Sequence, residues 1–186
     1  MRSIESRILM TALCTATLAL TSCSTYHSRD TAFTAEQKGE TTQYSADYSS
    51  RIPSHINTSE RTVMVDPNVH AWGAYDHTGN LVKSGLATAG AYYCPDIKRG
   101  CKTSAGSFRV QSLGASTCKS TRYPLPRGGA PMPYCMFFNK NQGLHGSQYV
   151  MEGNESHGCV RLNVADAEWL RFNFVNVGTK VVVKPY

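Results

Sequence analysis

The sequence has few of the features expected of a nucleic-acid-binding or zinc-binding protein. Charged residues make up only 17% of the chain, and no dense run of Lys and Arg is interleaved with aromatic residues. Nucleic acid is therefore not the expected partner. No Cys-x-x-Cys pair occurs, and no histidine accompanies the cysteines at zinc-ligand spacing. We expect neither a metal nor another cofactor. The apolar run at residues 8–20 is too short to span a bilayer comfortably.

The first residues have the pattern of an export signal. Two arginines precede the apolar run, and Leu20-Thr21-Ser22-Cys23 ends it with small residues before a cysteine. This end resembles a bacterial lipobox, which implies cleavage before Cys23 and lipid attachment at that residue. Ser24 then favours an outer-membrane anchor. An ordinary signal peptide or a weak transmembrane anchor is the alternative. We therefore interpret residues 1–22 as a lipoprotein signal peptide, and expect a chain anchored in the periplasm of the cell envelope.

The composition changes near residue 61. Residues 23–60 are rich in Ser, Thr, Gln, Asp and Tyr with few aliphatics, so they cannot bury enough apolar surface to fold alone. We predict a disordered tether there, followed by one domain over residues 61–186. The net charge of +6 suits an anionic polymer such as the cell wall, although Lys and Arg that merely solvate the surface explain it equally.

Hydrophobic periodicity predicts a mainly β domain with at least one packed helix. Apolar residues alternate around 63–65, and a turn at 76–80 separates two strand-like segments, which indicates a hairpin. Val164, Ala167, Leu170 and Phe174 then recur at helical spacing after Asn163, a possible N-cap. The strands expected from these patterns lie at 63–65, 69–75, 81–87, 107–110, 136–139 and 179–183.

Histidine and glycine occur together in two short stretches, and the second of them also contains a cysteine. They are Gly143-Leu144-His145-Gly146-Ser147 and Ser156-His157-Gly158-Cys159-Val160-Arg161-Leu162. An imidazole can remove the proton of a thiol and so create a strong nucleophile. A glycine beside the cysteine lets the backbone approach a bound carbonyl, and a neighbouring arginine can hold a substrate carboxylate. The pattern allows acyl transfer through a cysteine, but by itself it is more often a cysteine packed in the fold.

Together with the turn at 76–80, the stretch at 103–108 and the closing helix and strand around Gly178-Thr179, these motifs resemble the L,D-transpeptidases, the YkuD-type catalytic domain. The resemblance covers about residues 61–186. It implies a β-rich sandwich with a packed helix, a mechanism without metal, and peptidoglycan stem peptides as partners. A monomer is expected. Ser104 departs from the proline common in the family, and the spacing between His145 and Cys159 is slightly short.

The resemblance also assigns roles to individual residues. Cys159 matches the nucleophile, His145 the general base and acid, and the carbonyl of Gly146 the group that orients the imidazole. The remaining matches are the oxyanion-hole segment, His157 and Gly158 with the cysteine, and the substrate-binding positions Arg161, Ser156 and Ser147.

These roles imply a transpeptidase that builds or remodels the cell wall. Cys159 would attack the carbonyl between the third and fourth residues of a stem peptide, expel D-alanine and pass the acyl group to an amine. The alternatives are a hydrolase on the same scaffold, either an L,D-carboxypeptidase or a murein–protein amidase, and a catalytically inactive lipoprotein that binds the wall.

Four cysteines remain once Cys14 is removed with the signal, Cys23 is lipidated and Cys159 is kept as the nucleophile. In an oxidising compartment four cysteines form disulfides in one of three pairings. We favour Cys94–Cys101 with Cys118–Cys135, because each closes a local loop; reduced, buried thiols are the alternative. They lie in a proline-rich segment, residues 91–135, which we interpret as an insertion that is either a lid or a stapled surface loop.

Overall fold

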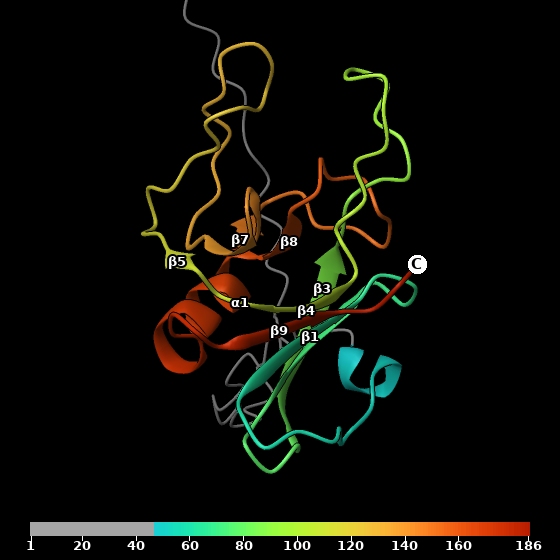
Figure 1. Cartoon of the computed structure of the whole chain (residues 1–186), viewed down its shortest axis with the longest axis vertical. Helices are drawn as coiled ribbons and strands as arrows, with labels where there is room; N and C mark the ends of the chain where they lie inside the picture. Colours follow the sequence, from blue (N-terminus) through green and yellow to red (C-terminus); the bar gives the residue numbers. More distant parts are fainter. Residues whose placement is uncertain (1–46) are drawn as a thin grey trace, which may run out of the picture. The chain divides into compact units, whose positions relative to one another are not determined.

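The computed structural model describes residues 47–186, shown in colour in Figure 1. The expected signal peptide at 1–22, the lipidation site Cys23 and most of the expected tether therefore lie outside the described residues. Within residues 47–186, no helix has the length and apolar character needed to cross a membrane.

The folded part begins earlier than composition predicted. Residues 47–60, expected to belong to the tether, carry a 3-10 helix at Tyr48–Arg51 and pack against the sheet. Ile52 is buried in a small cluster with Tyr75, whose hydroxyl donates a hydrogen bond of 2.8 Å to the carbonyl of Pro53. The predicted start of the domain at residue 61 was wrong. Buried Ile52 and a few backbone hydrogen bonds attach this polar segment to the sheet.

Nine strands form one curled sheet, which confirms the mainly β fold class (Figure 1). The strand order is β4-β9-β1-β2-β3-β8-β7-β6-β5. The pairs β1–β9 and β7–β8 are parallel and the other pairs are antiparallel. The strands are β1 (Thr62–Asp66), β2 (Ala71–Tyr75), β3 (Leu81–Thr88), β4 (Gly106–Arg109), β5 (Ser112–Leu113), β6 (Met136–Asn139), β7 (Gln142–Ser147), β8 (Val160–Asn163) and β9 (Lys180–Val183).

The main core lies inside the curl of the sheet. Trp72, Leu144 and Leu162 come from strands in both halves of the sheet and are fully buried in one cluster. The rings of Phe108 on β4 and Phe138 on β6 lie 5.4 Å apart, centroid to centroid, so strands from both ends of the order contribute to the same core. Burial of this apolar surface is the main force that holds β7 and β8 in place.

The α-helical part of the helix after β8 is shorter than the periodicity predicts. α1 spans Val164–Trp169 and continues as a π-helical segment, Leu170–Phe174, whose turn closes through a 2.7 Å bond from the amide of Val175 to the carbonyl of Leu170. The spacing identified the buried face correctly, since Ala167, Leu170 and Phe174 are all buried. Asn163 occupies the N-cap position without a side-chain capping bond.

Candidate active site

The parallel pair β7–β8 positions the cysteine and histidine predicted to react. In its register His145 lies opposite Arg161, and Leu144 lies opposite Val160. Side chains alternate along a strand, so His145 and Arg161 face the same side of the sheet. Cys159 lies immediately before β8, two residues before Arg161. All three line one cavity of about 660 Å³, together with Ser147, Ser156 and His157.

The imidazole of His145 is held as a neutral base. Its side chain is 6% exposed, and its Nδ1 lies 2.8 Å from the carbonyl oxygen of Gly146, as the resemblance implied. A carbonyl only accepts, so Nδ1 carries the proton and Nε2 is free to accept another. Burial lowers the pKa of His145 from 6.5 to about 4; the bond to Gly146 opposes this shift, and the charge of Arg161 adds to it.

The thiol of Cys159 is the one free cysteine of the described residues. It is half-buried, and its Sγ donates to the carbonyl of Asn141 over 3.4 Å. Burial raises the pKa of the Cys159 thiol above its usual value, while the amide of Gly143 and the charge of Arg161 act in the opposite direction. A protonated thiol beside a neutral imidazole is therefore the resting state at neutral pH, and ionisation requires transfer of the proton.

The loop before Cys159 is braced by its own serine. The hydroxyl of Ser156 accepts a 3.1 Å bond from the amide of Gly158 and donates to the carbonyl of Cys159. This hydroxyl is engaged within the loop instead of being free for a substrate. The amide of Gly158 is likewise engaged within the loop, and its expected part in an oxyanion hole stays a prediction. Gly158 has φ of 118°, a conformation suited to glycine.

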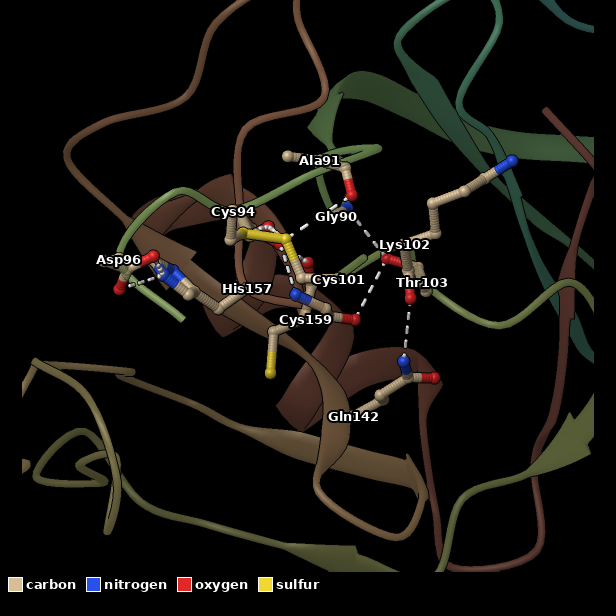
Figure 2. The surroundings of a disulfide bond; sticks show 12 residues. Gly90, Ala91, Cys94, Asp96, Cys101, Lys102, Thr103, Gln142, His157 and Cys159 are labelled. Atoms are coloured by element: carbon tan, nitrogen blue, oxygen red, sulfur yellow. Dashed lines mark hydrogen bonds and ion pairs between the residues drawn. A yellow bond between two sulfur atoms is a disulfide. The ribbon is translucent and has the colours of Figure 1, made fainter. Parts of the chain in front are cut away.

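Thr103 supports the same loop, a role that the sequence analysis missed. Its side chain is buried, donates a 3.0 Å bond to the carbonyl of Gly158 and accepts a 2.9 Å bond from the amide of Gly90. Beside it, Gln142 accepts a bond from the amide of Ser104 over 3.1 Å. Figure 2 shows these groups around Cys159, whose sulfur points away from the Cys94–Cys101 disulfide. The sequence signal for this role was that Thr103 belongs to the stretch 103–108, one of those that resemble the family.

The side chain of His157 joins two loops. Its Nε2 donates to both carboxylate oxygens of Asp96, at 2.8 and 2.9 Å (Figure 2), and its ring lies 4.3 Å from that of Tyr123. Asp96 and His157 form a possible metal cluster with Cys94. Cys94 is in a disulfide and has no thiolate to offer, so these residues do not fit a metal ion.

The four remaining cysteines form the expected pairs, Cys94–Cys101 and Cys118–Cys135. Asp96 belongs to the first closed loop and Tyr123 to the second, so the imidazole of His157 connects both loops to the segment that carries Cys159. Residues of both loops also line the cavity. The segment 91–135 is therefore a wall of the site, and whether it moves as a lid stays a prediction.

Comparisons with known proteins show to which family the chain belongs. The family model for the L,D-transpeptidase catalytic domain, YkuD, matches residues 55–183. No curated protein matches the chain in a direct comparison. Among solved structures, an L,D-transpeptidase from Xylanimonas cellulosilytica is 24% identical with a TM-score of 0.58, covering 71% of this chain and 64% of that one.

Two mycobacterial L,D-transpeptidases are also similar in fold. That from Mycobacterium smegmatis is 20% identical with a TM-score of 0.56, and covers 68% of this chain and 59% of its own. That from Mycobacterium tuberculosis is 20% identical with a TM-score of 0.53, and covers 67% and 57%. This chain thus spans less than two thirds of each of the three structures. On the strength of the family model, which accounts for most of its length, the chain belongs to the YkuD family of L,D-transpeptidase catalytic domains.

Proposed function

We propose that the chain is a peptidoglycan L,D-transpeptidase that uses Cys159 as nucleophile and His145 as general base and acid. The observation that carries the proposal is the shared cavity: a free thiol immediately before β8 and a buried, oriented imidazole on β7 both line it. Arg161, opposite His145 in the register, supplies a cation for a substrate carboxylate.

In the acylation step the thiol proton passes to Nε2 of His145, and the thiolate attacks the carbonyl carbon that joins the third and fourth residues of a stem peptide. The tetrahedral intermediate collapses as the C–N bond breaks. The leaving D-alanine takes the proton from the imidazolium, which leaves a thioester on Cys159 and a neutral imidazole.

In the second step an amine of another stem peptide attacks the thioester carbonyl. His145 accepts the amine proton and returns it to the sulfur as the C–S bond breaks, so that a new amide and the original thiol result. Hydrolysis differs only in that water takes the place of the amine. The amine is the acceptor proposed here, since the chain belongs to the transpeptidase family.

Incubation with purified muropeptides followed by mass spectrometry tests the proposal. Crosslinked or exchanged products are expected from the wild type, and Cys159→Ser and His145→Gln are each expected to abolish them. Only shortened peptides would identify a hydrolase. Wall binding without any turnover would identify an inactive binding lipoprotein and would contradict catalysis.

We also propose that the mature chain begins at a lipidated Cys23 and acts in the periplasm, anchored to the outer membrane. The support is the sequence of the leader: a charged start, an apolar run and small residues before the cysteine. A lipid anchor at Cys23 would hold the chain at the membrane and leave the catalytic domain in solution, next to the wall polymer.

A further inference from the structure

The cavity that holds Cys159 is lined by positive charge and, within the described residues, by no Asp or Glu side chain. Its cationic residues are Arg99, Lys119, Arg122, Lys140 and Arg161. None of the five forms an ion pair in the part of the chain from residue 47 to 186, where the ion pairs lie elsewhere. Within the described part of the chain these five cations therefore have no carboxylate partner.

Most of this charge comes from the two disulfide loops instead of the strands that carry the reacting groups. Arg99 belongs to the loop closed by Cys94–Cys101, and Lys119 and Arg122 to the loop closed by Cys118–Cys135. The one carboxylate of the first loop, Asp96, is occupied by His157. A cleft lined by charge of one sign focuses the electrostatic potential and concentrates ligands of the opposite sign.

We propose that Arg99, Lys119 and Arg122, here called the cationic wall, select an acyl-donor peptide that carries at least two free carboxylates. The inference rests on the proposed function and deepens it. One carboxylate pairs with Arg161 near the reacting bond, and another, farther along the peptide, pairs with the wall. The donor is recognised through its charge before Cys159 reacts.

The geometry favours a short peptide over an anionic polymer such as a polyphosphate. The cations border a cavity of about 660 Å³, the size of a small-molecule or short-peptide pocket. A reactive thiol lies in the same site, so the ligand must place an acyl carbon there. Cations that bind a polymer backbone lie instead along an open stripe.

Substitutions in both loops test the wall with matched controls. The test variants are Arg99→Gln, Lys119→Gln, Arg122→Gln and the triple combination. The controls are Lys98→Gln and Arg127→Gln, which remove exposed cations of the same two loops that do not line the cavity. The readouts are kcat/KM for a donor peptide with free carboxylates and for the same peptide with its carboxylates amidated, at low and high salt.

The triple variant is expected to lower kcat/KM for the free-carboxylate donor by about tenfold or more, chiefly through KM and most strongly at low salt. The amidated donor and both control variants should change by less than about twofold. Equal losses for the two donors, or equal losses in the controls, would overturn the wall as a charge-recognition surface. Stronger competition by inorganic polyphosphate than by the carboxylate peptide would overturn it as well.

Two further measurements separate failure of the wall from failure of the proposed function. Alkylation of Cys159 by iodoacetamide, a neutral reagent, should proceed at the same rate in the wild type and the triple variant, which shows that the site is intact. Calorimetric binding of the free and amidated peptides to Cys159→Ala needs no turnover. If the protein binds the free-carboxylate peptide selectively but shows no turnover, the proposed enzymatic function is refuted and the cationic wall stands. If it shows turnover without charge selectivity, the cationic wall is refuted and the enzymatic function stands.

Discussion

At the scale of single residues, His145 sets the pH range of the proposed reaction. Burial depresses its pKa to about 4, so the imidazole is an available base at any pH above that value. The acid limb of kcat/KM is expected near pH 4 instead of near 6.5, since the free enzyme loses activity only when Nε2 is protonated. Activity assays from pH 3.5 to 7.5, with circular dichroism to confirm the fold at each pH, would measure it; a limb at 6.5 contradicts the prediction.

The same residue makes stability depend on pH. Between pH 4 and 6.5 the unfolded chain protonates this histidine and the folded chain does not, so the free energy of unfolding falls as the pH is lowered through that window. The contribution amounts to about 3 kcal/mol. Urea unfolding at pH 7 and at pH 4 should show a smaller pH-dependent loss in His145→Gln. His77→Gln, at an exposed turn, should retain the wild-type loss.

Thr103 carries a prediction about the loop that holds Cys159. Thr103→Val keeps the shape but leaves the amide of Gly90 and the carbonyl of Gly158 without their partner. An unsatisfied buried group costs about 1–3 kcal/mol, so the melting temperature should fall and alkylation of Cys159 should slow. Thr117→Val, at an exposed position, is the control. An unchanged alkylation rate would show that the hydroxyl does not position the loop.

At the scale of structural elements, the contact between Asp96 and His157 joins a disulfide loop to the segment that carries Cys159. Asp96→Asn removes the carboxylate that accepts from His157 while keeping the size of the side chain. Because the pair is partly exposed, stability should change by no more than about 1 kcal/mol. The acylation rate should fall several-fold, since the loop wall is no longer held beside Cys159. Glu155→Gln, exposed in the same segment as His157, should leave both quantities unchanged.

The strands that carry the candidate site were harder to predict than the others. The hairpin of β2 and β3 was predicted because Asp76 and Gly79 form a local turn, in which Asp76 accepts bonds from the amides of Thr78 and Asn80 at 2.8 and 3.0 Å. β7 and β8 were not predicted. β7 contains glycines at 143 and 146, which weaken its strand propensity. Its strand conformation depends instead on pairing with β6 and β8 in the folded sheet.

At the scale of the whole molecule, the predicted lipid anchor ties the catalytic domain to a membrane. Cys23→Ala should abolish palmitate labelling and release the protein from the membrane fraction, because no lipid can then be attached. Cys14→Ala, inside the expected signal peptide, should leave both unaltered. Labelling that survives Cys23→Ala would show that the lipobox was misassigned. Metabolic labelling and membrane fractionation of the producing cells measure both.

The sequence by itself determined the candidate reacting groups and the family: which thiol is left over, which histidine accompanies it, and which family the motifs resemble. These follow from residue types at short spacing. Only the tertiary structure decided that Asp96 meets His157 and Thr103 meets Gly158, contacts that span 61 and 55 residues. It also decided the depressed pKa of His145. The reason is physical: burial and long-range pairing are properties of the folded chain as a whole, and no local pattern encodes them.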